Sequence, residues 1–204
     1  YDYVNRFNTT SVNGSQNLQA QYGGITAKLN LDREPRFYSS LGFDRGYSRT
    51  WGNLWQLRMK KGENHGRIAN SDDYLITGYA LKKLVHPDSE GDSYSKIVTY
   101  AWPMIRLAEL YLNYAEAINE SIGPNQDAYN ALNLIRERAG VMSVEDSWGN
   151  SSISANLNKH TTQEGFRDIV RQERLIELSF EGNRYNDLRR WKLADEYFNS
   201  PVYG

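Results

Sequence analysis

The strongest pattern of hydrophobic and polar positions lies in residues 161–191, which read TTQEGFRDIVRQERLIELSFEGNRYNDLRRW. Apolar residues recur there at helical spacing and predict a long helix that faces the core. The predicted apolar stripe consists of Phe166, Ile169, Val170, Ile176 and Phe180. Thr161 and Glu164 have the spacing of a capping box, so we expect the helix to begin at Thr161. The pair Gly182-Asn183 is a common helix stop, which predicts a break followed by a second short helix up to Trp191.

Two carboxylates, Glu173 and Glu177, fall in the middle of this stripe, one helical turn apart. Buried like charges are costly unless cations meet them, so we expect arginines to converge there. The candidates are Arg184, Arg106 and Arg136. Paired carboxylates also suit acid–base catalysis or a metal site. We favour a structural network of Glu and Arg that fixes helix packing, because buried charges are normally paired.

Two further periodic segments, residues 104–120 and 126–139, predict an antiparallel helical hairpin. Pro103 suits the start of the first helix, and Gly140 suits the end of the second. The expected apolar face of the first helix is Met104, Leu107, Ala108, Tyr111, Leu112, Ala115 and Ile118. That of the second is Ala128, Ala131, Leu132, Ile135 and Ala139. The small residues permit close packing of the kind that builds helical-repeat superhelices.

The remaining segments predict less regular structure. Residues 1–100 hold short apolar runs between Gly, Asn, Asp and Ser, which predicts loops with brief strands or single helical turns. Pro35 permits a helix start there, with Phe37, Tyr38 and Leu41 packing as one face. Residues 141–160 are polar and predict a long loop. The fold class is therefore mainly α, with a loop-rich portion over residues 1–100 and a helical portion over residues 101–204.

Composition narrows the class of protein. The 204 residues, 39% of them hydrophobic, suffice for one core of ordinary domain size and leave room for a second small lobe. Residues 1–204 are expected to form a single region. A net charge of -1 lacks the basic footprint of a nucleic-acid-binding protein. The absence of cysteine excludes disulfides and thiolate chemistry. The sequence starts at Tyr1 and shows no signal peptide or spanning run, so we expect any export signal or anchor to lie upstream.

Aromatic residues supply the candidate ligand site. Tyr47, Trp51 and Trp55 recur at four-residue spacing among Gly, Ser, Arg and Asn. Such a spacing is common in a core face, but the polar neighbours favour partial exposure, and an exposed indole is costly unless something covers it. Trp148 lies in a similar polar stretch. The candidate ligand-binding residues are Tyr47, Arg49, Trp51, Asn53, Trp55 and Trp148.

Other chemistry has little support in the sequence. His65, His86 and His160 lie in separate loops without partners at metal-ligand spacing, so no metal site is expected. The segment GGITAK at residues 23–28 lacks the arrangement of a phosphate-binding loop. No strained nucleophile turn of the G-x-S-x-G kind is present. A Ser/His/Asp triad stays open as an alternative, and the aromatic cluster at residues 47–55 remains as the candidate site.

Four segments resemble the SusD/RagB family, and the resemblance is to its C-terminal half. They are WPMIRLAELYLNYAEAINE (102–120), NLIRERAGV (133–141), RQERLIELSFEGNRYNDLRRW (171–191) and EPRFYSSL (34–41). The last is close to the family's D-P-R-F pattern, with Glu34 where aspartate is common. The ER-x-x-EL-x-x-EG-x-R-x-x-DL-x-RW string is the most specific part.

The resemblance implies a glycan-binding outer-membrane lipoprotein of Bacteroidetes that faces outward as a lid on a SusC-type TonB-dependent transporter. It implies a mostly helical fold in which tetratricopeptide-like helix pairs form a scaffold and a loop-rich face holds the ligand. The acylated cysteine and the earlier repeats would lie in an N-terminal half that precedes this sequence. The family has no shared catalytic residues or cofactor, and its sugar contacts vary, so none is transferred to a position here.

Three functions compete on these grounds. The leading hypothesis is non-catalytic glycan capture for nutrient uptake, with rings stacked on exposed aromatics. The second is a protein-interaction scaffold or a peptide-binding lid of the same kind of transporter. The third, an enzyme such as a glycosidase, requires two carboxylates about 5 to 10 Å apart in an open cleft.

Overall fold

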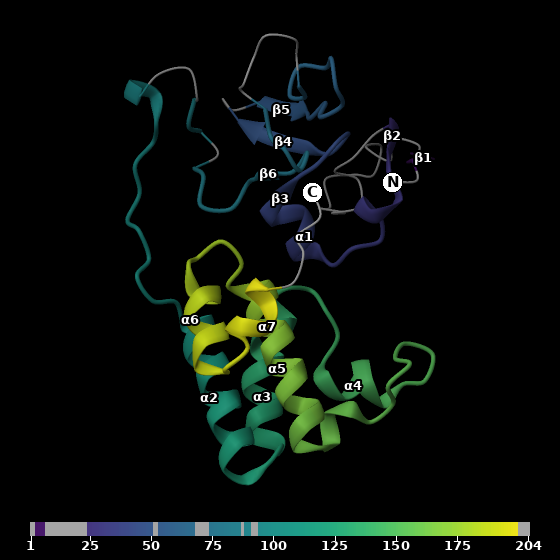
Figure 1. Ribbon diagram of the computed structural model, residues 1–204, viewed down its shortest axis with the longest axis vertical. Coiled ribbons are helices and arrows are strands. Elements are labelled where there is room, and N and C mark those ends of the chain that lie inside the picture. Colours follow the sequence, from purple (N-terminus) through teal and green to yellow (C-terminus); the bar gives the residue numbers. More distant parts are fainter. Residues whose placement is uncertain are drawn as a thin grey trace. The chain divides into compact units, whose positions relative to one another are not determined.

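A computed structural model describes residues 3–6, 24–50, 53–67, 74–86, 88–90 and 94–199. The chain divides into two compact units, Tyr1–Trp102 and Pro103–Tyr203, whose helices and strands are labelled in Figure 1. Each unit has a hydrophobic core of its own.

The first unit is built from short antiparallel pairs of strands. In it β1 (Tyr3–Arg6) pairs with β2 (Gly24–Ala27), β3 (Leu41–Gly42) with β6 (Ala80–Leu81), and β4 (Tyr47–Thr50) with β5 (Asn53–Gln56). Its described helical pieces are η2 (Lys28–Asn30), α1 (Pro35–Ser40) and η3 (Tyr94–Lys96). Brief strands and single turns were the expectation for this part of the chain, and the described residues confirm it.

A small aromatic core holds this unit together. Tyr38 and Phe43 are buried beside Leu31, and Phe37 packs edge-on against Tyr38 with ring centroids 5.3 Å apart. Pro35 starts α1 as predicted, since its fixed φ suits a first helical residue. Leu41 was predicted to join this face but lies in β3, because the chain becomes extended there (φ -120°, ψ 133°), and Phe43 fills the core instead.

The second unit is helical throughout its core. Its elements are α2 (Leu107–Ile122), α3 (Gln126–Arg138), α4 (Val144–Gly149), the 3-10 turn η4 (Lys159–Thr161), α5 (Gln163–Glu177), α6 (Asn183–Arg190) and α7 (Ala194–Phe198). α2 and α3 form the predicted hairpin, and α5 packs along α2 (Figure 1). Together with the helical content of the described residues, this confirms a mainly α fold class.

The first hairpin helix begins three residues later than predicted. Arg106 is its N-cap in extended conformation (φ -114°), because its guanidinium is held by the far end of α5. Met104 and Leu107 therefore lie off the core face and are exposed. The remaining predicted residues pack in the core or against it, joined by the buried Asn119, which exchanges hydrogen bonds with Gln163.

α5 begins one residue later than the capping-box pattern indicates. Thr162, not Thr161, is the N-cap, and its Oγ1 accepts from Gly165 N at 3.1 Å. Thr161 belongs to η4, where its hydroxyl donates to Asn158 O. The residue three positions after the cap is thus glycine, so the reciprocal bond from Glu164 is absent from the described contacts.

The predicted break near Gly182 is confirmed, although α5 already ends at Glu177. Gly182 adopts φ 82°, a left-handed conformation that glycine takes without strain, and caps α6. Phe166, Ile169 and Val170 are buried as predicted. Phe180 was predicted to extend this stripe but is half exposed, because the helix has ended and its φ is 67°.

Residues 141–160 were predicted as a loop, and this was wrong for α4. Ser143 caps that helix by accepting from Asp146 N, and its hydroxyl donates to Asp146 Oδ2 at 2.8 Å. Val144 is buried in the core cluster that α4 covers. A Ser-x-x-Asp capping signal was present in the sequence but only one turn of helix followed it.

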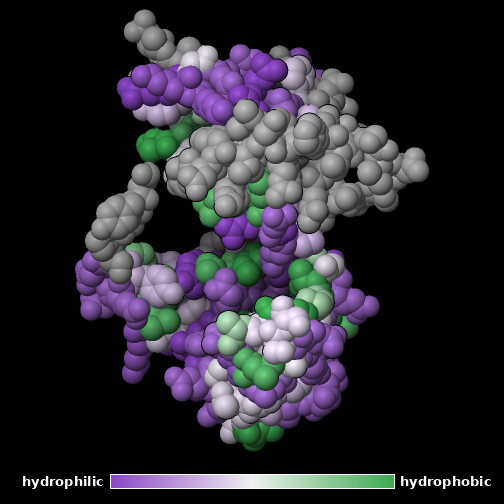
Figure 2. All heavy atoms as spheres, turned by 90° about the vertical axis from the view of Figure 1, so that its right-hand side faces the viewer, coloured by the Kyte–Doolittle hydropathy of each residue, from purple (hydrophilic) through white to green (hydrophobic). Residues whose placement is uncertain are grey.

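The surface of the helical unit is mixed. On the face shown in Figure 2, apolar side chains reach the surface in small groups among polar ones. Among the described residues, no helix combines the length and the apolar character that crossing a membrane requires.

Candidate functional site

The predicted aromatic site lies on a β-hairpin, not on a helix. β4 and β5 pair so that Tyr47 faces Gln56 and Ser48 faces Trp55. Directly opposed residues share a face of an antiparallel pair, and successive residues alternate between faces. Tyr47 and Trp55 therefore occupy opposite faces of the hairpin, although four-residue spacing would bring them together on a helix.

Trp55 is the most exposed described residue of the predicted platform, at 44% relative exposure, whereas Tyr47 is half-buried. Trp51 lies outside the described residues. Arg49 and Asn53 lie within β4 and β5, and only their backbone belongs to the described part. A binding role for these residues stays a prediction.

The base of the hairpin is tied to the core of the first unit. Lys82 Nζ donates to the carbonyl oxygens of Tyr38 (2.7 Å) and Tyr47 (3.0 Å). Burial lowers the pKa of Lys82, and the two carbonyl acceptors give its ammonium group partners. Arg45 NH2 pairs with Glu63 at 2.5 Å beside the same strand. This anchoring holds the hairpin, and with it Trp55, in a defined position within the unit.

The two carboxylates of α5 are ion-paired as predicted, with one change of partner. Arg136 NH1 lies 2.7 Å from Glu173, and Arg106 NH1 lies 3.0 Å from Glu177. The third partner is Arg138, 2.5 Å from Glu177, and not Arg184 as predicted. Arg184 follows the break after α5, which turns its side chain toward Trp191 and Tyr197 instead.

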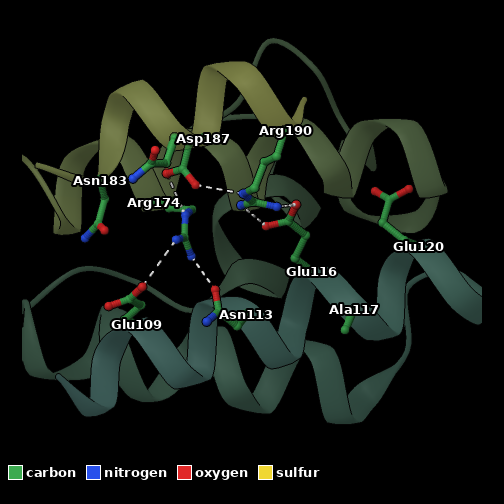
Figure 3. A pocket seen from close by; sticks show the side chains of 10 residues that line it. Glu109, Asn113, Glu116, Ala117, Glu120, Arg174, Asn183, Asp187 and Arg190 are labelled. Atoms are coloured by element: carbon green, nitrogen blue, oxygen red, sulfur yellow. Dashed lines mark hydrogen bonds and ion pairs between the residues drawn. The ribbon is translucent and has the colours of Figure 1, made fainter. Parts of the chain in front are cut away.

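A polar pocket of about 520 Å³ lies between α2, α5 and α6 (Figure 3). Arg174 reaches across it, donating to Asp187 Oδ2 at 2.7 Å and to Asn113 Oδ1 at 2.6 Å. Arg190 forms a two-pronged pair with Glu116, whose carboxylate also accepts from Trp191 Nε1 at 2.7 Å. Arg190 and Trp191 form the RW pair of the string that resembles the SusD/RagB family, and both donate to the same carboxylate of α2.

The carboxylates of this pocket suit ion pairing better than proton transfer. Burial raises the pKa of Glu116, but hydrogen bonds from Arg190 and Trp191 outweigh it and hold that pKa below its ordinary value. A bidentate pair with Arg167 likewise lowers the pKa of Glu120. A general acid at neutral pH needs the opposite shift. Sequence reasoning missed this pocket, because its members come from three helices separated by up to 81 residues (Glu109 to Arg190).

Trp148, the remaining predicted residue, lies in the second unit. Its ring packs against the core cluster and carries the Arg136 guanidinium at 5.2 Å. Trp148 also lines a second pocket of about 350 Å³, together with Trp191, Tyr197, Arg171, Arg184 and Lys159. The structure therefore separates the predicted site residues into the hairpin group of the first unit and Trp148 in the second.

The three histidines lie apart from one another in contacts of different kinds. His65 and His86 each accept a backbone N–H at Nδ1, from Arg58 and Asp88. His160 is buried edge-on against Tyr129 at 5.6 Å. No group of three His, Asp or Glu side chains among the described residues is arranged to hold a metal ion.

The described residues thus combine a helical hairpin, C-terminal helices bridged by arginines, and a β-hairpin that carries an exposed tryptophan. The sequence profile of the SusD family matches residues 1–204, and the chain belongs to that family. It is 37% identical over 94 residues to SusD-like protein P2 of Formosa agariphila, covering 46% of this chain and 17% of that protein. It is 38% identical over 88 residues to SusD-like protein P25 of the same organism, covering 43% and 15%.

A solved structure shares the fold. The crystal structure of a SusD-like protein from Bacteroides fragilis matches with a TM-score of 0.63 and 28% identity, over 80% of this chain and 29% of that one. The matches thus span less than a third of the relatives' own lengths.

Proposed function

We propose that this chain is part of a cell-surface protein that binds glycans without catalysis, for uptake through a SusC-like TonB-dependent transporter. Membership of the SusD family over residues 1–204 carries the proposal. The protein would be an outward-facing lipoprotein of the outer membrane, with a glycan and the transporter as its partners and no nucleic acid. It needs no cofactor for this task.

Two features of the described residues support glycan binding. The indole of Trp55 is exposed on an anchored hairpin, where it can stack on a sugar ring. Stacking of this kind contributes about 1 to 3 kcal/mol per ring, if it resembles base stacking on aromatics. The buried and pocket carboxylates are held by arginines, which favours binding over glycoside hydrolysis.

The test is affinity electrophoresis of the complete polypeptide through gels that carry a panel of polysaccharides. We expect one glycan to retard the wild type and to lose this effect on the Trp51→Ala,Trp55→Ala variant. Trp102→Ala, which removes another exposed indole of the first unit, is the matched control and should remain retarded. Retardation by no glycan would count against sugar capture and favour a peptide ligand, and a large fall in melting temperature would assign the tryptophans to the core.

A second candidate function is docking of a protein partner, here the transporter, by the helical hairpin. Leu107, Leu110 and Tyr114 lie on one side of α2, and each is more than half exposed. Replacing Leu110 and Tyr114 by Glu should abolish co-purification with the transporter and leave glycan affinity unchanged. Loss of glycan affinity with intact co-purification would reject this surface as the docking site.

A further inference from the structure

The second pocket of the helical unit holds two arginines that lack a carboxylate partner in the described part of the chain. Arg171 comes from α5 and Arg184 from α6. Lys159 and Asp168 also line the pocket and are paired with each other at 3.2 Å. Arg171 and Arg184 therefore leave the pocket with an excess of positive charge, although Arg171 also helps to lower the pKa of the Glu120 carboxylate.

Aromatic rings hold these guanidinium groups in place. Arg171 lies over Trp191 at 4.9 Å from the ring centroid, and Arg184 lies over Tyr197 at 4.8 Å. A guanidinium stacked by its face keeps the N–H donors of its edge available. Nε of Arg171 is buried and has no hydrogen-bond partner among the described residues. A buried donor without a partner is costly, so this edge calls for an acceptor.

The pocket in Figure 3 shows what the same residue type does when it is structural. There Arg174 and Arg190 are each satisfied by carboxylates or amides of α2 and α6. Arg190 also lies over the Trp191 ring at 4.7 Å, so stacking on a ring does not by itself distinguish these arginines. Arg171 and Arg184 differ because they lie over rings without such an acceptor among the described residues. The difference indicates a ligand site and not a packing device.

We propose that this pocket binds an oxyanion-bearing sugar unit of the ligand, that is, a sugar acid or a sulfated sugar. The guanidinium edges of Arg171 and Arg184 donate to the oxyanion, for which the planar fork of arginine is suited. Gln172 supplies an amide for hydroxyl groups, and the half-exposed ring of Tyr197 supplies a stacking face. The volume of about 350 Å³ lies within the range of small-ligand sites. This inference rests on the proposed function, because it names the class of glycan.

The test is an NMR titration of the whole chain, following the Trp148 and Trp191 indole N–H signals and the Arg171 Nε–H signal. The probes are D-glucuronate, D-glucose 6-sulfate, neutral D-glucose and glutarate, an acid without a sugar ring. We expect at least one acidic sugar to bind. Glucose should bind about tenfold more weakly because it loses a charged hydrogen bond, and glutarate should bind about tenfold more weakly because it lacks the ring and its hydroxyl groups. Which acidic sugar binds more tightly identifies the oxyanion.

Variants locate the effect. Arg171→Gln and Arg184→Gln should each weaken acidic-sugar binding about tenfold. Arg189→Gln makes the same charge change on α6, where Arg189 lies over Tyr185 outside the pocket, and should bind as the wild type does. If Arg171→Gln fails to fold, Arg171→Lys keeps the charge but loses the fork and should still bind more weakly.

Four results would each overturn the inference. The first is that neither acidic sugar binds more tightly than glucose, and the second is that glutarate binds as tightly as the acidic sugars. The third is an equal loss in Arg189→Gln, and the fourth is the absence of any response. Retardation by a polysaccharide in the gel experiment, together with any of these results, would leave the proposed function standing and remove only this pocket from it.

Discussion

Glu173 and Glu177 are buried one turn apart on α5, yet each has its own arginines. Arg136 is itself buried and also donates to Met142 O and Ser147 Oγ, which joins α3, α4 and α5 at one side chain. Arg106 joins the start of α2 to both Glu177 and Glu181. The spacing of the two carboxylates predicts that arginines pair with them. The packing of the helices decides which arginines these are.

Replacing Glu177 by Gln should lower the free energy of unfolding by about 1 to 3 kcal/mol, because Arg138 loses its carboxylate partner and Arg106 keeps only Glu181. Urea denaturation followed by circular dichroism measures this. Glu137→Gln makes the same change on the exposed side of α3 and should shift stability by about 0.5 kcal/mol or less. A folded and equally stable Glu177→Gln protein would contradict the structural role and reopen a catalytic one.

Glu116 predicts a pH dependence. Its folded-state pKa is held below the ordinary value of 4.5 by Arg190 and Trp191, so its contribution to stability is present above about pH 4.5 and is lost as the pH falls through the folded pKa. Glu116→Gln should therefore cost about 1 to 2 kcal/mol at pH 7, and this cost should shrink steadily as the pH falls below about 4.5. Denaturation midpoints of the two proteins across this range test the prediction, and a constant difference would refute it.

At the scale of elements, helix positions follow from the sequence more closely than helix ends do. The periodicity of residues 126–139 predicts α3 to within a residue, and Asn125 caps it by accepting from Ala128 N. The starts of α2 and α5 were misplaced because Arg106 contacts Glu177 at the end of α5, and because Thr161 belongs to η4 and donates to Asn158 O. Local capping signals compete with tertiary contacts that a sequence pattern does not contain.

The cap of α5 gives an element-level prediction. Thr162→Ala should destabilise the protein by about 1 kcal/mol, because Gly165 N loses its acceptor. Thr161→Ala removes only an exposed hydroxyl bond within η4 and should cost less. Thermal unfolding of the two variants compares them. A larger loss for Thr161→Ala would restore the original assignment of the cap.

At the scale of the whole molecule, the chain has two cores that share no residue in the described part. Leu132→Ala, at a fully buried position, should cost the helical unit about 2 to 5 kcal/mol. Hydrogen exchange should then accelerate in α2, α3 and α5, with β3 and β6 unchanged. Tyr38→Ala should do the reverse. Equal acceleration in both units by either variant would show that they unfold as one.

The candidate sites are also divided between the two units, with the hairpin in the first unit and the pocket of Arg171 and Arg184 in the second. The sequence pointed to exposed aromatics, and Trp55 is exposed, but the hairpin register puts Tyr47 on the other face. The pocket around Arg171 and Arg184 was invisible in the sequence except for Trp148, because its residues come from α4, η4, α5, α6 and α7. The sequence did contain one signal for this pocket. Residues 171–190 hold more arginines than buried carboxylates, so some of these arginines need other partners.

By itself the sequence determined the mainly α class, the α2–α3 hairpin, the break at Gly182 and the need for arginines at Glu173 and Glu177. These follow from hydrophobic periodicity, backbone freedom and the cost of burying charge, all of which act over a few residues. Only the tertiary structure decided that Arg138 and not Arg184 meets Glu177, and that Arg184 turns to an aromatic pocket. Which charges meet depends on distances between elements far apart in the chain, and these are set by packing.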